Sequence, residues 1–238
     1  MDQAHIDFWL KEFEHFTTLI VANGEVPSSE LSLSILKEKK RVVCCDGALQ
    51  KLLSINIIPD VVVGDGDSMD GELLQIQTDS DSACRDVACN VSTSGRNIPY
   101  YPDCSEEYND LQKALKYCQA NGYDDVLLLG CGGLREDHFI ANLSILVMYS
   151  ETMNLIMLTE HGVFNVLRGA ATLPSFPGLQ VSVFPSNLHT RLSFSGLKYP
   201  VNNRSFNWLW EGSLNEALGD AFTVEADDEE PAVVYRAI

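Results

Sequence analysis

The sequence predicts a protein of two parts: an N-terminal α/β part with a mostly parallel sheet, and a C-terminal all-β part with an antiparallel sandwich or barrel. In the first two thirds of the chain, apolar runs of strand length alternate with segments whose apolar residues recur at helical spacing. Beyond about residue 154, short apolar runs separated by Gly, Pro and Asn follow one another without a long helix. We therefore expect two domains, over 1–150 and 154–238, with 150–152 as a short linker.

Each predicted element of the N-terminal part has its own apolar pattern. In chain order these elements are a strand at 17–23, a helix at 28–39, a strand at 41–46, a helix at 47–56, a strand at 58–65, a helix at 109–122, a strand at 124–131 and a helix at 136–150. Strands and helices that alternate in this way form a parallel sheet with helices on both faces, so we expect a Rossmann-like sheet. The segment 78–97 is rich in Ser, Thr and Asp without a clear period, and we expect it to leave the sheet.

The C-terminal part contains short apolar runs bounded by turn residues. The predicted strands are 154–160, 162–169, 179–185, 190–196, 221–226 and 232–238. Because no long helix separates them, we expect these strands to pair antiparallel.

The composition excludes several classes of function. The 238 residues carry a formal net charge of −18 and no basic stripe that could neutralise phosphates, so we expect no nucleic-acid partner. No stretch reaches the roughly 18 consecutive apolar residues of a membrane helix, so we expect no membrane partner. Residues 1–16 mix acids with aromatics, unlike a secretory signal, and the seven cysteines lack the spacing of a zinc site. We therefore expect a cytoplasmic protein in which most cysteines are buried thiols.

Acidic residues gather where the predicted strands end. Asp46 closes the strand at 41–46, and Asp65 and Asp67 follow the apolar run of the strand at 58–65. Ligands of open parallel sheets collect beyond the carboxyl ends of the strands, so these acids predict a binding site. Carboxylates so close repel one another unless a cation lies between them, and Mg²⁺ prefers such oxygen ligands together with substrate phosphates. The alternative is an Asp-Gly turn with solvated acids, because Asp and Gly are common turn residues.

The segment GCGGLREDH (130–138) joins the end of a predicted strand to the start of a predicted helix. It lacks the spacing of a phosphate-binding P-loop and of a dinucleotide-binding fingerprint. Its Arg135, Asp137 and His138 lie where helix amides and the helix dipole favour phosphate. The alternative is that Glu136 and Asp137 only support the first helical turn while His138 packs.

Four motifs in order along the chain resemble those of the thiamin pyrophosphokinase family. They are CCDGAL, similar to ADGGA; VVVGDGDS, similar to GDxDS; EEYNDLQKAL, similar to [TN]-D-x-x-K-A-L; and GGLREDHFIANLSIL, similar to G-G-R-x-D-H-x-x-A-N-L. Further on, SGLKYPVNN and EGSLNEA resemble segments of the family's sandwich domain. The resemblance covers most of the chain.

This resemblance implies transfer of a pyrophosphoryl group from ATP to the hydroxyl of thiamin with Mg²⁺, which gives thiamin diphosphate and AMP. It implies catalytic roles for Asp65, Asp67, Arg135 and Asp137, metal binding by Asp65, Asp67 and Asp110, and nucleotide binding by Asp46, Gly47, Asn109, Asp110, Gly133 and His138. It also implies a thiamin contact from Asn215, and Ser213, Trp208 and Trp210 are further candidates for thiamin contacts. Members of this family are homodimers with active sites at the subunit interface, so we expect a homodimer.

Trp208 and Trp210 stand two positions apart and are expected on one face of a strand. There, one of them could form an aromatic wall for the thiamin cation, or both could pack in the sandwich core or at a dimer interface. Two other functions remain open from the residues alone. One is a metal-dependent phosphohydrolase that uses the same acids, and the other is a non-catalytic sensor of a cationic ligand.

Overall fold

The computed structural model of the chain describes residues 2–38, 40–68, 89–93, 96–226 and 230–238. Of the segment 78–97, which we expect to leave the sheet, residues 78–88 and 94–95 lie outside these described residues. For the described part this expectation is wrong, because β4 (Cys89–Thr93) pairs with the next strand at the edge of the sheet. Within the described ranges, no helix combines the length and the apolar composition needed to cross a membrane.

The chain forms two compact units. Unit 1 comprises Met1–Ile145 and Thr152–Glu160, and unit 2 comprises Leu146–Glu151 and His161–Ile238. The domain ranges 1–150 and 154–238 stay a prediction of where separate domains begin and end.

The strands of unit 1 form a sheet that is parallel except at one edge. Across this sheet lie β7 (Asn154–Leu158), β6 (Asp125–Leu129), β1 (Thr18–Val21), β2 (Arg41–Cys45), β3 (Val61–Gly64), β5 (Arg96–Pro102) and β4 (Cys89–Thr93). Every neighbouring pair is parallel except β4 with β5. The predicted strands at 17–23, 41–46, 58–65 and 124–131 and the parallel pairing are therefore confirmed.

One predicted strand has a different partner from the expected one. The strand predicted at 154–160 forms as β7, but its expected antiparallel pairing is wrong, because β7 pairs parallel with β6. The physical reason is the long helix between these two strands. It returns the chain to the edge of the sheet at which β6 begins, so β7 runs in the same direction as β6.

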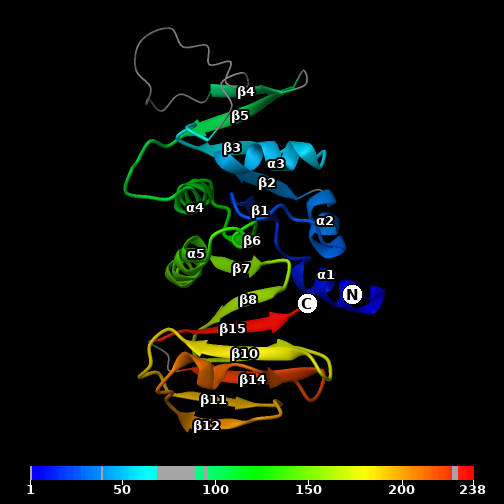
Figure 1. Cartoon of the computed structure of the whole chain (residues 1–238), viewed down its shortest axis with the longest axis vertical. Coiled ribbons are helices and arrows are strands. Elements are labelled where there is room, and N and C mark those ends of the chain that lie inside the picture. Colours follow the sequence, from blue (N-terminus) through cyan, green and yellow to red (C-terminus); the bar gives the residue numbers. More distant parts are fainter. Residues whose placement is uncertain (1, 39, 69–88, 94–95, 227–229) are drawn as a thin grey trace. The chain divides into compact units, whose positions relative to one another are not determined.

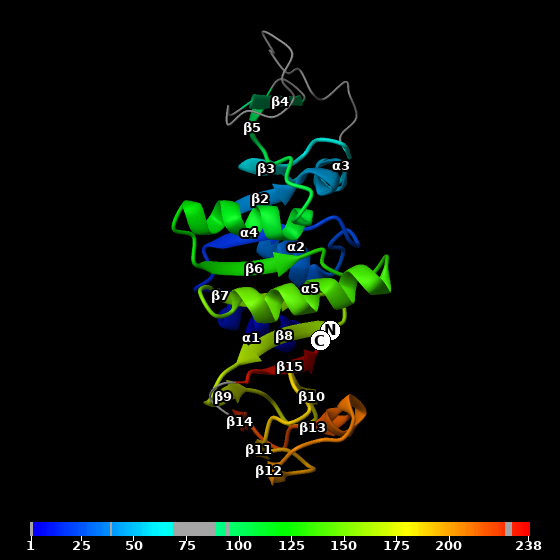
Figure 2. The same cartoon turned by 90° about the vertical axis from the view of Figure 1, so that its left-hand side faces the viewer.

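Helices cover both faces of this sheet. They are α1 (Gln3–Phe13), α2 (Glu30–Lys37), η1 (Asp46–Ala48), α3 (Leu49–Ser54), α4 (Asp110–Ala120) and α5 (Glu136–Tyr149). Figure 1 shows α4 and α5 on one face and α1 and α2 on the other, and Figure 2 shows α4 and α5 in front of the strands. The Rossmann-like arrangement expected for the N-terminal part is thus confirmed.

Local side-chain chemistry explains where two of these helices begin. The Ser29 hydroxyl accepts a hydrogen bond from the amide of Ser32 at the start of α2. Asn109 and Gln112 form a capping box at the start of α4, which fixes the position of Asp110 in its first turn. Helix α1 was not predicted, although its buried Trp9 and Phe13 lie one helical turn apart.

Unit 2 consists of two antiparallel sets of strands. One set has the order β13 (Asn215–Glu216), β10 (Gln180–Pro185), β15 (Ala232–Ala237) and β8 (Gly162–Leu167). The other has the order β12 (Val201–Arg204), β11 (Leu192–Ser195), β14 (Ala221–Ala226) and β9 (Ala170–Pro174). The antiparallel fold predicted for the C-terminal part is therefore confirmed.

Four of the cysteines match the expectation of buried thiols. These are Cys44, Cys45, Cys118 and Cys131, all free and buried, whereas Cys104 is disulfide-bonded. Burial raises the pKa of the Cys131 thiol to about 12, so this thiol is protonated and unreactive at neutral pH.

Candidate active site

A cavity of about 660 Å³ lies at the carboxyl ends of the parallel strands of unit 1. Ala22 follows β1, Cys45 ends β2, Asp65 follows β3 and Cys131 follows β6, and all four residues line this cavity. The start of α4 and the loop before α5 complete its wall. Its position is the one at which open parallel sheets bind ligands.

Three carboxylates form what we call the acidic cluster: Asp46, Asp65 and Asp67. One oxygen of each lies within 4.8 Å of an oxygen of the other two. They converge because β2 and β3 are neighbouring parallel strands, and each ends immediately before one of these acids. Three carboxylates at this separation fit Mg²⁺, which prefers oxygen ligands. Asp110, the fourth expected acid, lines the cavity at the start of α4.

Asp46 is the buried member of the acidic cluster. Its carboxylate accepts hydrogen bonds from the amides of Gly47, at 2.6 Å, and Gly66, at 2.9 Å. A Cβ atom at Gly64 would overlap the Asp46 side chain, so glycine at this position allows the strand to approach the acid. Burial, followed by the charge of Asp110, raises the pKa of Asp46 to about 6 despite the two amide hydrogen bonds.

The raised pKa of Asp46 predicts a pH-dependent stability. An aspartate in the unfolded chain titrates near 3.9, roughly two units lower, so between these values the folded protein holds a proton that the unfolded chain has released. In metal-free buffer the free energy of unfolding should therefore fall as pH rises from about 4 to about 6, by about 2 kcal/mol from this group. Denaturant unfolding of wild type and Asp46→Asn across this range measures the difference. Parallel pH profiles would contradict the prediction.

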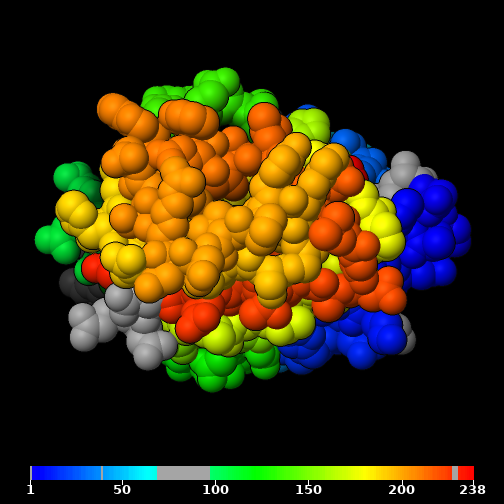
Figure 3. Space-filling model, turned by 90° about the horizontal axis from the view of Figure 1, so that it is seen from below, coloured from blue at the N-terminus to red at the C-terminus, as the bar shows by residue number. Residues whose placement is uncertain are grey.

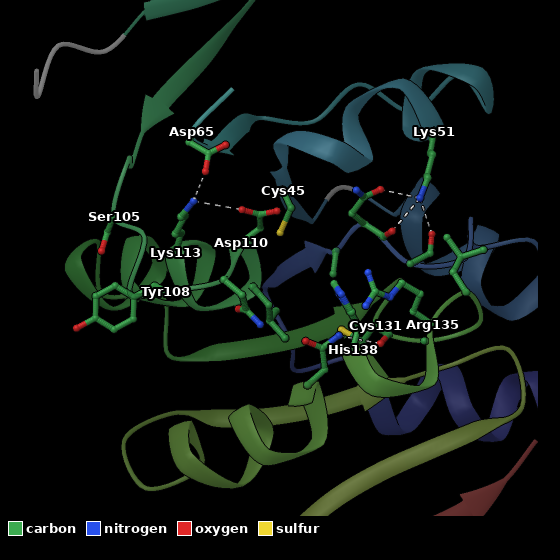
Figure 4. A pocket seen from close by; sticks show the side chains of 18 of the residues that line it. Cys45, Lys51, Asp65, Ser105, Tyr108, Asp110, Lys113, Cys131, Arg135 and His138 are labelled. Carbon is green, nitrogen blue, oxygen red and sulfur yellow. Dashed lines mark hydrogen bonds and ion pairs between the residues drawn. The ribbon is translucent and has the colours of Figure 1, made fainter. Parts of the chain in front are cut away.

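Lys113 connects the acidic cluster with Asp110. Its side chain is only 3% exposed, and its ammonium group donates to Asp65 Oδ2 at 2.7 Å and to Asp110 Oδ1 at 3.4 Å (Figure 4). Burial alone would raise the pKa of Asp65, but the hydrogen bond from Lys113 and the amide of Asp67 lower it overall. Burial raises the pKa of Asp110 in spite of Lys113. The buried ammonium group thus keeps two acids close together.

Sequence reasoning missed Lys113 as a site residue. A signal was present, because Lys113 stands three residues after Asp110 within the quoted motif EEYNDLQKAL, and residues three apart share a helix face. It also missed Lys51, which lines the cavity from α3, and Asn23, which lines it after β1.

The loop before α5 brings Arg135 and His138 to the cavity, as expected. Arg135 donates through Nε to Asp137 Oδ1 at 3.1 Å and through Nη2 to Asp137 Oδ2 at 2.5 Å, and both side chains are exposed. The hydrogen bond from Arg135 lowers the pKa of Asp137. Asp137 therefore holds the guanidinium group but is not itself in the cavity lining. His138 is exposed, which argues against the alternative that its side chain only packs in the interior.

Three other expected nucleotide-binding residues lie at or near this cavity. Asn109 lines it, but its side-chain oxygen already accepts the amide of Gln112 in the capping box. Gly47 follows Asp46, and a Cβ atom there would overlap the side chain of Asn23. Gly133 has a φ of +87°, which favours glycine, and is not in the lining.

In unit 2 the two expected tryptophans are exposed, Trp208 by 65% and Trp210 by 71%. They do not lie on a strand as expected, because Leu209–Gly212 forms the 3₁₀ helix η2 and Trp208 precedes it. The Glu211 carboxylate closes this turn by accepting the amides of Asn207 and Trp208. The alternative of packing in the sandwich core is therefore wrong. Figure 3 shows a face of unit 2 on which the orange segments near residues 190–215 form much of the surface.

Asn215 is buried, and its side chain is engaged with the backbone. Its Oδ1 accepts the amides of Tyr199 at 3.0 Å and Glu216 at 2.9 Å, and its Nδ2 donates to the carbonyl of Tyr199 at 2.8 Å. The Ser213 hydroxyl donates to the carbonyl of Trp210 at 2.7 Å. Both residues therefore shape the segment that carries the exposed aromatic side chains.

Comparison with known proteins assigns both units to one family. The family model described as "Thiamin pyrophosphokinase, catalytic domain" matches residues 33–157, and the one described as "Thiamin pyrophosphokinase, substrate-binding domain" matches residues 162–235. A search of curated proteins gives no significant match.

Solved structures share the fold at low sequence identity. The thiamine pyrophosphokinase from Bacillus subtilis is similar with a TM-score of 0.71 and 18% identity, over 92% of this chain and 98% of that one. The thiamin pyrophosphokinase from Candida albicans has a TM-score of 0.72 and 17% identity, over 95% of this chain and 91% of that one. Because the catalytic-domain model alone matches more than half of the sequence and includes the acidic cluster, this chain belongs to the thiamin pyrophosphokinase family.

Proposed function

We propose that this protein transfers the pyrophosphoryl group of ATP to the hydroxyl of thiamin, giving thiamin diphosphate and AMP. The observation that carries the proposal is the acidic cluster at the strand ends, which lies within the range of the family's catalytic-domain model and of which Asp65 lines the cavity. Transfer of this kind requires charge neutralisation and in-line positioning more than a strong base, and clustered acids with an arginine and a lysine supply both.

Mg²⁺ is the expected metal, with Asp65 and Asp67 among its ligands. For the third carboxylate we propose Asp46, the nearest acid to these two, in place of the Asp110 that the resemblance implies. When bound, such an ion neutralises negative charge on the transferred phosphates. Lys113 keeps Asp65 and Asp110 from separating. In the reaction, the thiamin oxygen bonds to the β-phosphorus as the bond from that phosphorus to the AMP oxygen breaks. A carboxylate at the cavity takes the hydroxyl proton, and Arg135 stabilises charge on the transferred group.

Unit 2 offers a surface for thiamin and for a second subunit. Between residues 199 and 218, unit 2 carries six large apolar side chains that are more than half exposed. They are Tyr199, Trp208, Leu209, Trp210, Leu214 and Leu218. Aromatic faces attract a cationic heterocycle such as thiamin, and exposed apolar residues of this number are typical of an interface. We therefore propose a homodimer in which unit 2 of one subunit supplies thiamin contacts to the active site of the other.

One assay separates this proposal from the two alternatives. The protein is mixed with thiamin, ATP and Mg²⁺, and AMP, phosphate and thiamin diphosphate are measured. A thiamin pyrophosphokinase produces AMP and thiamin diphosphate in equal amounts. A phosphohydrolase would release phosphate without thiamin, and a sensor would produce neither. Both latter results would refute the proposed function.

Replacing Arg135 with Lys should lower the rate of transfer about tenfold to a hundredfold, because a point charge cannot reproduce the planar fork of the guanidinium group. The matched control is Arg191→Lys in unit 2. The Arg191 guanidinium group also donates two hydrogen bonds to one residue, in that case to the side chain and the carbonyl of Asn203. Initial rates at saturating ATP and thiamin measure the effect. Equal rates for the two variants would exclude a role for Arg135 in the reaction.

We expect the reaction to take place in the cytoplasm. Support comes from the four free, buried cysteines, which suit a reducing compartment; the disulfide-bonded Cys104 is the exception.

A further inference from the structure

Lys51 makes three hydrogen bonds with one short segment of the chain. From α3 its ammonium group donates to Asn23 Oδ1 at 2.6 Å, to the Asn23 carbonyl at 2.9 Å and to the Gly24 carbonyl at 2.8 Å. An ammonium group has three protons, so these acceptors use all of them. All three residues line the cavity, with Lys51 on the opposite side of the view from the Asp65–Lys113 pair in Figure 4.

The segment held by Lys51 supports the glycine-rich loop before α5. The Gly24 amide donates to the Gly130 carbonyl at 2.7 Å, and the Glu25 amide donates to the Gly132 carbonyl at 2.7 Å. A Cβ atom at Gly24 would overlap the Gly130 carbonyl, so the two segments approach as closely as backbone allows. Displacement of residues 23–25 would therefore also displace the glycine-rich loop.

We propose that Lys51 is a positioning residue for nucleotide binding, which anchors the loop after β1 and through it the glycine-rich loop. The inference rests on the proposed function in that it takes ATP as the ligand of the cavity. Lys51 acts without donating to the nucleotide, because its protons are taken by Asn23 and Gly24. Its loss should weaken ATP binding and leave the acidic cluster intact, since no member of that cluster is bonded to it.

The test compares Lys51→Met with Lys51→Arg and with Lys40→Met. Methionine keeps the length of the side chain and removes all donors, and arginine keeps the charge and part of the donor set. Lys40 is the matched control, because it also donates to a backbone carbonyl in unit 1, that of Phe13 at 2.8 Å, but does not line this cavity.

Two measurements on the full chain report on the anchor. In Lys51→Met, hydrogen exchange of the Gly24 and Glu25 amides should accelerate at least about tenfold, since charged hydrogen bonds of this kind restrain the segment. The dissociation constant and the KM for ATP should rise by a similar factor, while kcat and the KM for thiamin stay within about twofold. Lys51→Arg should recover part of the affinity, and Lys40→Met should resemble wild type.

The outcomes separate this inference from the proposed function. Unchanged hydrogen exchange or unchanged ATP affinity in Lys51→Met would overturn the inference. So would faster exchange and weaker ATP binding in Lys40→Met. A wild-type protein that binds ATP but forms no thiamin diphosphate would refute the proposed function and not the role of Lys51. Hydrogen exchange and ATP titration would still test that role. A wild-type protein that binds no ATP would overturn both.

Discussion

Replacing Asp67 with Asn should abolish formation of thiamin diphosphate while the protein keeps its fold. Asp67 is an exposed member of the acidic cluster, and its carboxylate accepts a hydrogen bond from the neighbouring hydroxyl of Ser68. The substitution removes one negative charge at nearly constant shape, so it weakens cation binding without disturbing packing. Loss of one metal ligand should reduce the rate at least about a hundredfold.

The measurement is the initial rate of AMP and thiamin diphosphate formation at several Mg²⁺ concentrations, together with the midpoint of denaturant unfolding. Asp125→Asn is the matched control, because Asp125 begins β6 at the opposite end of the strands from the acidic cluster. Asp65→Asn should be equally inactive, and it should also lose stability, because Lys113 is then left with a weaker partner. Retention of a tenth or more of the activity in both variants would refute the metal-site assignment.

The sequence predicted most of the sheet because each strand carries its own signal. Runs such as VVV at 61–63 are apolar throughout and end at glycine or aspartate, as expected for strands buried on both faces. The partner of a strand carries no such local signal. The strand β7 resembles the C-terminal strands in composition, and its parallel pairing with β6 depends on the crossover by α5. The pairing of β5 with β3 was missed because the connection between them follows no regular period.

The acidic cluster was predictable for the same reason, since its members follow neighbouring strands directly. Asp46 and Asp65 each occupy the first position after a strand, and parallel strands end at one edge. Lys51 was not predicted, because lysines on amphipathic helices are usually solvated and nothing local distinguishes this one. Lys113 was missed although it stands three residues after Asp110. Their roles depend on which loops the fold places opposite them.

The thiamin-binding side was the least predictable. The spacing of Trp208 and Trp210 indicated a strand, whereas the structure has a 3₁₀ turn closed by Glu211. A carboxylate that accepts two amides can override a two-residue pattern, because a turn needs only a few such hydrogen bonds. Both tryptophans are exposed as a result, which makes them suitable for contact with a ligand or a partner.

Mixing two inactive variants should restore activity if each active site takes residues from both subunits. The first variant is Asp67→Asn, and the second carries Trp208→Ala and Trp210→Ala together. The tryptophans are exposed and can be truncated without opening a core cavity, in contrast to Asn215, whose side chain holds three backbone groups. We expect the double variant to lose at least about a hundredfold in kcat/KM for thiamin, because stacking and cation–π contacts of two rings disappear.

In a mixed dimer, one site receives both lesions and the other receives neither. With random exchange of subunits about half of the dimers are mixed, and each has one intact site of two, so activity should recover to about a quarter of wild type. Differently tagged subunits and a pull-down establish that mixed dimers form, and the recovered rate should increase with the fraction of mixed dimers. Mixed dimers without recovered activity would mean that Asp67 and the tryptophans serve the same site within one chain. This result would refute the shared site, because two-fold symmetry then offers no intact combination.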